Sequence, residues 1–162
     1  MLPKFWRLNA WGKDIRSVIT QALRVGSRGA VRHDDFLMLT RVTGQLRVEW
    51  RARDSHPWDR DDPASVRAES FLQQALVDTD TVIVKLFQAL PAEIERIEIR
   101  VLDPVKCEKV IIAGTIDRED LSTSTSPSLR MRLKMLGVNY SSIRGDRIEA
   151  LSIDEAASIR SA

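Results

Sequence analysis

The segment richest in groups that can do chemistry covers residues 54–62, with the sequence DSHPWDRDD. Asp54, His56 and Asp59 place two carboxylates and one imidazole close together along the chain. Such groups bind metal ions, or act as a general base beside the residue that orients it. They are therefore the candidate catalytic residues of a metal-dependent enzyme. A metal site needs further ligands and the only other histidine is His33, so the sequence assigns no metal ligand and no cofactor.

The same segment also has a structural interpretation and a binding interpretation. In the structural one, the two aspartates make turn hydrogen bonds and Trp58 anchors the loop against the core. In the binding one, Trp58 belongs to a recognition loop. The chain lacks the glycine-rich nucleotide motifs, the H-E-x-x-H and C-x-x-C metal motifs and the G-x-S-x-G hydrolase motif. These absences favour a binding protein over an enzyme.

Basic side chains form a second set of candidate binding residues. They alternate along a predicted strand and recur on a predicted short helix, and they are Arg47, Arg51, Arg53, Arg130, Arg132 and Lys134. Such a face could contact nucleic-acid phosphates. The alternation places Trp50 on the opposite strand face, so no aromatic pair accompanies the arginines. In the alternative interpretation, Glu49 and Glu98 pair with arginines across neighbouring strands on the outer face of the sheet.

The charge is unevenly distributed along the chain. Residues 1–60 carry 12 basic and 6 acidic side chains, a balance of +6, whereas residues 61–122 carry 7 and 13, a balance of −6. Surfaces of two signs favour self-association or a protein partner. The basic, amphipathic segment 4–25 predicts a helix that covers its own domain, docks on a partner, or lies on a membrane surface.

The composition is that of an ordinary globular domain. The 162 residues are 43% hydrophobic and 30% charged, which predicts one domain over residues 1–162. No apolar run is long enough to span a bilayer, and the start of the chain has no secretory-signal pattern. Cys107 is the only cysteine, so no internal disulfide forms, and we expect a reducing, cytoplasmic location.

Two apolar patterns before the candidate loop predict a hairpin. Residues 36–42 are apolar almost throughout, which is typical of a strand that is covered on both faces or central in a sheet. Thr43 and Gly44 provide a turn. The residues that follow alternate strictly, with Leu46, Val48, Trp50 and Ala52 on the core side.

A long helix is predicted after the loop. Asp62 is the expected N-cap, Pro63 the first helical residue, and Pro91 the stop. Between them, apolar residues recur at helical spacing on one face. Residues 78–80, with the sequence DTD, interrupt this pattern and are expected on the outer side of the helix.

The rest of the chain predicts a second hairpin and a helical end. Strands are expected over 97–101 and 110–116, where Gly114 indicates a bulge or the close approach of another element. A polar linker leads to a short helix capped by Ser126, opened by Pro127 and ended by Gly137. A small hairpin with strands over 140–143 and 147–151, turning at 145–146, and a frayed helix over 152–162 complete the chain.

These patterns predict an α+β fold. The most economical arrangement is a two-layer sandwich, with an antiparallel sheet of about four strands from two hairpins, a long central helix, and N- and C-terminal helices over residues 1–26 and 152–162. The leading functional hypothesis is a protein–protein binding or assembly module. The alternatives are a basic nucleic-acid-binding face and a metal-dependent enzyme that uses residues 54–59.

Overall fold

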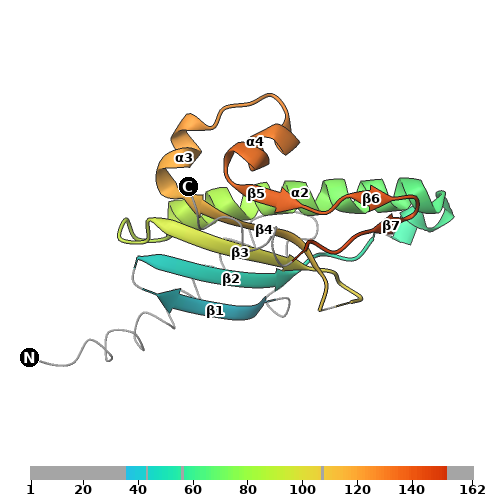
Figure 1. Ribbon diagram of the computed structural model, residues 1–162, viewed down its shortest axis with the longest axis horizontal. Coiled ribbons are helices and arrows are strands. Elements are labelled where there is room, and N and C mark those ends of the chain that lie inside the picture. Colours follow the sequence, from blue (N-terminus) through green and yellow to red (C-terminus); the bar gives the residue numbers. More distant parts are fainter. Residues whose placement is uncertain (1–35, 43, 56, 107, 153–162) are drawn as a thin grey trace, which may run out of the picture.

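The computed structural model describes residues 36–42, 44–55, 57–106 and 108–152 of the chain (Figure 1). The described part is a mixed α+β structure. A sheet of five strands, in the order β1-β2-β3-β4-β5, forms its centre. The strands are β1 Phe36–Val42, β2 Gln45–Arg51, β3 Arg96–Leu102, β4 Val110–Asp117 and β5 Val138–Tyr140.

The other described elements are helices and a small two-stranded ribbon. The helical segments are the 3₁₀ helix η2 Pro57–Asp61 and the α-helices α2 Ala64–Ala89, α3 Arg118–Thr123 and α4 Leu129–Met135. The ribbon consists of β6 Ile143–Arg144 and β7 Arg147–Ile148. It confirms the small hairpin expected around residues 145–146, but its strands are shorter than expected, because Tyr140 pairs with Ile112 and thus belongs to β5.

The expectation of an all-antiparallel sheet was wrong. β2 and β3 are parallel neighbours, with Leu46 opposite Ile97 and Trp50 opposite Val101, while the other pairs of neighbouring strands are antiparallel. The reason is α2, which lies along the sheet and returns the chain to the end where β2 began (Figure 1). A strand that follows such a crossover runs in the same direction as the one before it.

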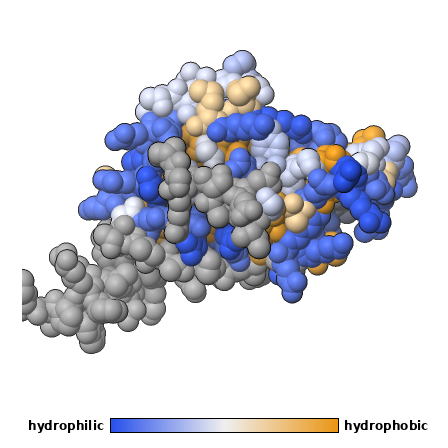
Figure 2. All heavy atoms as spheres, in the orientation of Figure 1, coloured by the Kyte–Doolittle hydropathy of each residue, from blue (hydrophilic) through white to orange (hydrophobic). Residues whose placement is uncertain are grey.

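The hydrophobic core lies between α2 and one face of the sheet. Residues of α2 that are buried recur at helical spacing, among them Leu72, Leu76, Ile83 and Leu86. They belong to one cluster with the inward residues of β2, such as Trp50, which is only 1% exposed. Figure 2 shows that hydrophilic residues dominate the visible described surface, with small hydrophobic patches between them.

The opposite face of the two parallel strands carries ion pairs. Arg47 Nη2 lies 2.9 Å from Glu98 Oε2, and Arg100 Nη1 lies 3.9 Å from Glu49 Oε2. Both pairs join residues of β2 and β3 that face each other in the register. The prediction of cross-strand ion pairs on the outer face of the sheet is confirmed.

The strand β1 does not take a central position, which is one of the two placements that its sequence predicts. It pairs with β2 and lies at the edge of the sheet. Its pairing with β2 is regular from Met38 to Val42, after a register shift between Phe36 and Met38. Gly44, in the turn that follows, has a φ of 69°, a conformation that favours glycine.

Gly114 lies where another strand comes close, as the sequence predicts. A Cβ atom at this position would be 2.7 Å from the carbonyl oxygen of Gly137 and 2.8 Å from the Cα of Val138. Gly137 ends the short helix α4 as expected, with a φ of 83°. The cap of α4 differs from the prediction: Ser128, not Ser126, accepts a hydrogen bond from the Met131 amide.

The N-terminal end of α2 differs from the sequence prediction, whereas its C-terminal end agrees, because the helix ends at Ala89 and Leu90, before Pro91, is extended. Pro63, not Asp62, is the N-cap residue, and no side chain caps this end. The segment expected to be a polar linker contains α3, which begins at Arg118. Residues 78–80 are not all on the outer side, because Thr79 is fully buried and its hydroxyl donates to the Ala75 carbonyl.

Three sequence predictions concern residues outside the described ranges. They are the N-terminal helix within 1–26, the C-terminal helix beyond 152, and the environments of His56 and Cys107. Among the described residues, no helix is long and apolar enough to cross a membrane.

Candidate functional site

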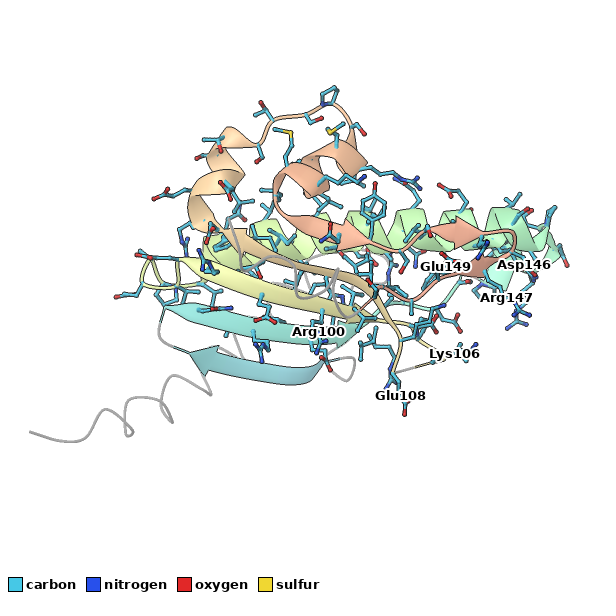
Figure 3. The ribbon with its side chains drawn as sticks, viewed as in Figure 1. Arg100, Lys106, Glu108, Asp146, Arg147 and Glu149 are labelled. Atoms are coloured by element: carbon cyan, nitrogen blue, oxygen red, sulfur yellow. The ribbon has the colours of Figure 1, made fainter. Side chains whose placement is uncertain are left out.

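A pocket of about 440 Å³ lies at the end of the sheet where β2 and β3 finish. Four segments line it: the loop and 3₁₀ helix after β2, the first turns of α2, the β3–β4 loop and the β6–β7 turn. Figure 3 shows the last two segments through labelled side chains, with Lys106 and Glu108 on the β3–β4 loop and Asp146 on the β6–β7 turn. The candidate loop of the sequence therefore forms one wall of this pocket.

Parallel strands explain why these segments meet. Asp54 follows β2 and Asp103 follows β3, and the carboxyl ends of parallel neighbours lie at the same edge of a sheet. The long helix starts beside this edge, because it must run back along the sheet. Sequence reasoning identified Asp54 and Asp59 but missed Asp103 and Asp146. The sequence feature that could have identified them is their position in turns just after strands. An antiparallel arrangement of β2 and β3, as we predicted, would have placed Asp54 and Asp103 at opposite ends of the sheet.

Two of the pocket aspartates hold their own loops in shape. Asp54 Oδ1 accepts a hydrogen bond of 2.7 Å from the Ser55 amide, as the structural interpretation predicts. Asp103 Oδ1 accepts from the amides of Val105 and Lys106 at 2.8 and 2.9 Å, and its Oδ2 lies 3.9 Å from Lys109 Nζ. The charge of Asp103 is thus largely used within the loop.

Two of the remaining lining carboxylates make no ion pair within the described residues. Within the described residues, no ion pair joins Asp59 or Asp146 to a basic side chain. Arg67 donates through Nη1 to the carbonyl oxygen of Arg60, 3.1 Å away. Four aspartates and two arginines line the pocket in total, so its formal charge is negative. Apolar groups complete the lining: Ala64, Ala68, Phe71, Pro104, Val105 and Ile148.

Two large apolar side chains project into solvent from the pocket segments. Trp58 is 84% exposed, on the same 3₁₀ helix as the lining residues Asp59 and Arg60. Val105, on the β3–β4 loop, is 76% exposed and itself lines the pocket. The interpretation of Trp58 as an anchor against the core was therefore wrong. Tryptophan is enriched among the residues that contribute most of the binding energy at protein interfaces.

The described residues give little support to the metal-site interpretation. His56 lies outside the described residues. Among the residues that are described, no three histidine, cysteine, aspartate or glutamate side chains are grouped so that they could hold a metal ion.

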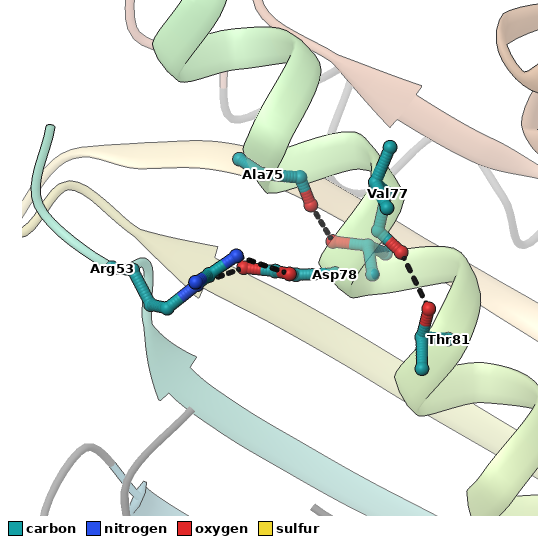
Figure 4. Close-up of polar contacts among 6 residues, drawn as sticks. Arg53, Ala75, Val77, Asp78 and Thr81 are labelled. Atoms are coloured by element: carbon teal, nitrogen blue, oxygen red, sulfur yellow. Dashed lines mark hydrogen bonds and ion pairs between the residues drawn. The ribbon is translucent and has the colours of Figure 1, made fainter. Parts of the chain in front are cut away.

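Most of the predicted basic binding residues interact with neighbouring side chains of the chain itself. Arg53 makes a two-pronged contact with Asp78 of α2, at 2.7 and 2.8 Å, which ties the loop after β2 to the helix (Figure 4). This pair explains why a charged residue, Asp78, is tolerated where the apolar periodicity of α2 is interrupted. Arg51 is half-buried, and its Nε makes no hydrogen bond within the described residues.

The basic residues of α4 likewise face α2 and β5. Arg130 pairs with Glu69 of α2. Both Arg130 and Lys134 lie over the ring of Tyr140, at 6.0 and 5.6 Å from its centroid. Arg132 Nε lies 3.3 Å from Asp80 Oδ1. These contacts bind α4 to the rest of the described fold and reduce the charge that the helix offers to a phosphate.

Burial raises the pKa of Asp80 above its ordinary value of 3.8, although Arg132 acts in the opposite direction. The folded state therefore binds the Asp80 proton more tightly than the unfolded state does. Stability from this group is fully present below pH 3.8 and is lost as the pH rises through the raised pKa.

The Asp80→Asn variant cannot ionise, so it should gain stability relative to the wild type as the pH rises through that window. Urea unfolding of both proteins between pH 3 and 7 measures the difference. Arg132→Gln keeps Asp80 but removes the opposing charge, so the free energy of unfolding of this variant should depend more strongly on pH than that of the wild type. A difference between Asp80→Asn and wild type that shrinks as the pH rises would contradict the raised pKa.

No protein-family model, no curated protein and no solved structure matches the chain. The function must therefore be argued from the residues of the pocket.

Proposed function

We propose that this chain is a protein-binding module that recognises a basic peptide segment of a partner protein at the pocket beside Trp58. The observation that carries the proposal is the 84% exposure of Trp58 on a segment that lines a pocket of about 440 Å³. A tryptophan loses little conformational entropy when it is covered by a partner, and it contributes a large apolar contact.

The charge of the lining sets the chemistry of the partner. Asp59 and Asp146 have no basic partner within the described residues, and the aspartates of the lining outnumber the arginines. A lysine or arginine side chain has an aliphatic stem and a cationic head. Its stem would lie along Phe71 and Ile148, and its head would meet the two carboxylates. An apolar neighbour in the same peptide would cover Trp58 and Val105.

The two alternative functions have less support. The arginines proposed for nucleic-acid binding at 47, 53, 130 and 132 each lie within 4 Å of a carboxylate of the chain itself. Phosphate binding by these residues would have to break or share those pairs. The candidate metal residues Asp54 and Asp59 do share the pocket, but the described residues contain no group suited to a metal ion.

A peptide-display selection against the full chain tests the proposal. Enriched peptides should carry a lysine or arginine next to an aromatic or aliphatic residue. Hydrogen exchange should show protection by these peptides at residues 57–60 and 103–105. Failure to enrich any peptide, enrichment of acidic peptides, or protection confined to other segments would contradict it.

Charge variants identify the pocket as the binding site. Asp59→Asn and Asp146→Asn should each weaken binding of an enriched peptide by about three-fold, the range of a partly exposed charge pair, and should make binding less sensitive to salt. The matched control is Glu108→Gln, an exposed carboxylate on the β3–β4 loop that does not line the pocket (Figure 3). An equal loss in the control would show that the effect is only long-range charge.

A further inference from the structure

The β6–β7 ribbon forms one wall of the pocket although it has little structure of its own. Its two strands have two residues each, and a two-stranded ribbon of this size is not stable alone. Residues 144–147 are exposed, while Ile143 and Ile148 pack against the core. Asp146 and Ile148 also line the pocket, so the shape of the pocket depends on the contacts that tether the ribbon.

Backbone hydrogen bonds tether both ends of the ribbon to the start of β4. The Ser141 amide donates to the Ile111 carbonyl oxygen at 2.8 Å, and the Leu151 amide donates to the Val110 carbonyl oxygen at 3.0 Å. These bonds fix the base of the ribbon. They do not fix its turn, where a Cβ atom added to Gly145 would meet no atom within 4 Å. Segments with so few contacts open at a low free-energy cost.

The side chain of Lys109 joins the ribbon to the β3–β4 loop, which is another wall of the pocket. Its ammonium group donates a hydrogen bond to the carbonyl oxygen of Ile148 and lies 3.9 Å from Asp103 Oδ2. Ile148 and Asp103 both line the pocket. Lys109 therefore contacts two walls of the pocket, and it does so with a side chain that is only 19% exposed.

The backbone of Lys109 is itself held at the base of the β3–β4 loop. Its amide donates to the Lys106 carbonyl oxygen at 2.8 Å, and its carbonyl oxygen accepts from the Asp103 amide at 2.9 Å. The side chain thus starts from a fixed point. Because a largely buried ammonium group needs polar partners, the oxygen atoms of Ile148 and Asp103 also keep its head in place.

We infer that Lys109 is a positioning residue of the pocket, which holds Asp146 within reach of a bound cationic side chain and so sets the selectivity for that side chain. The inference rests on the proposed peptide-binding function. Asp146 comes from the ribbon, whereas Asp59 comes from η2. Both carboxylates can meet one cation only if the two segments keep their separation, and Lys109 ties the ribbon down between its base and its turn.

The charge of Lys109 and its positioning role predict opposite effects on binding. If Lys109 acted only through its charge, its removal would make the pocket more negative, and a cationic peptide would bind more tightly. If Lys109 positions the ribbon, its removal lets Asp146 move away, and the peptide binds more weakly. The sign of the change in affinity therefore distinguishes the two roles.

The first test uses Lys109→Met, which removes the ammonium group and keeps a long side chain. The probes are the tightest-binding basic peptide from the display selection and the same peptide with norleucine in place of its lysine or arginine. Lys109→Met should weaken the basic peptide by about three-fold, as Asp146→Asn does, and bring the two dissociation constants closer together. The matched control is Lys106→Met, which removes an exposed charge of the same loop outside the pocket lining (Figure 3). It should bind the basic peptide at least as tightly as the wild type.

A double variant tests whether Lys109 acts through Asp146. Because Asp146→Asn already removes the carboxylate, adding Lys109→Met should weaken binding no further, whereas independent effects would multiply to about nine-fold. Independent losses, or a Lys109→Met variant that binds the basic peptide as tightly as the wild type, would overturn the inference and leave the proposed function intact. A wild type that binds no basic peptide would overturn both.

Hydrogen exchange of the free protein gives a measurement that needs no peptide. In Lys109→Met, exchange should become faster over residues 142–149 and stay unchanged in β2 and β3, which also shows that the variant is folded. Lys109→Arg keeps a charged donor and should restore part of the protection. Lys109→Gln keeps a polar group but is one bond shorter, so it should give the same change as Lys109→Met with less risk to the fold. Unchanged exchange over 142–149 in the methionine and glutamine variants would overturn the inference whether or not a peptide binds.

Discussion

Arg118→Ala is expected to lower the free energy of unfolding by about 3 kcal/mol, since it removes several hydrogen bonds to a charged group at once. For a chain of this size, the corresponding fall in the melting temperature is about 6–12 °C. The guanidinium donates to the carbonyl oxygens of Phe87, Leu90, Pro91 and Ile94, at 2.7 to 3.3 Å. It also lies 5.0 Å from the ring centroid of Phe87.

These contacts make Arg118 the cap of α2. The last carbonyl groups of a helix have no partner within the helix, and the negative end of the helix dipole favours a cation there. The Arg118 side chain thus donates hydrogen bonds to carbonyl oxygens both at the end of the longest helix and in the loop that leads to β3. Its loss leaves several carbonyl groups without a donor at the point where the crossover joins the sheet.

Two variants distinguish capping from a simple charge effect. Arg118→Lys keeps the charge but cannot reach four carbonyl groups with a planar fork, so it should recover less than half of the loss. Arg96→Ala removes an arginine from the exposed pair with Asp117, the residue just before Arg118, and should change stability by less than about 0.5 kcal/mol. Thermal unfolding of the three variants measures this order. A loss for Arg118→Ala as small as that for Arg96→Ala would contradict the capping role.

Gly114→Ala is expected to cost about 3 kcal/mol, at the upper end of what overpacking causes. The added Cβ would lie 2.7 and 2.8 Å from atoms of Gly137 and Val138. Both are backbone atoms, so no side chain can rotate away, and β5 must move away from β4. Urea unfolding should show the loss, and hydrogen exchange should show faster exchange in β5 than in β2.

Gly145→Ala is the matched control. Gly145 lies in the β6–β7 turn with a φ of 65°, and a Cβ there would meet no atom within 4 Å. Only the left-handed backbone conformation then opposes the change, at a cost of about 1 kcal/mol. Equal losses for the two variants would show that the close approach of β5 to Gly114 does not limit the stability of the fold.

The parts of the fold that could be predicted are those encoded in local patterns. The alternation over residues 46–52 predicts one core-facing set of side chains, and all four of its members are buried: Leu46, Val48, Trp50 and Ala52. Gly114 indicates a close approach, and β5 supplies it. In each case the signal is a property of the residue and its immediate neighbours, so a single sequence is sufficient to show it.

The parts that could not be predicted depend on which elements become neighbours. Apolar periodicity shows that 97–101 is a strand but does not say whether it runs parallel to β2. For the same reason no local pattern predicts the contact between Arg53 and Asp78. Nor does any local pattern predict the pocket that brings Asp54 close to Asp103. The exposure of Trp58 could not be predicted either, because a tryptophan in a loop can be buried or exposed.

The most direct test of the proposed function is the dissociation constant of an enriched basic peptide for Trp58→Ala against the wild type. A tryptophan that carries an interface contributes about 2 kcal/mol or more, so we expect binding to weaken by about 30-fold or more. Met135→Ala, which shortens an exposed apolar side chain on α4, should change it by less than about two-fold. Equal dissociation constants for the wild type and Trp58→Ala would contradict a recognition surface at this pocket.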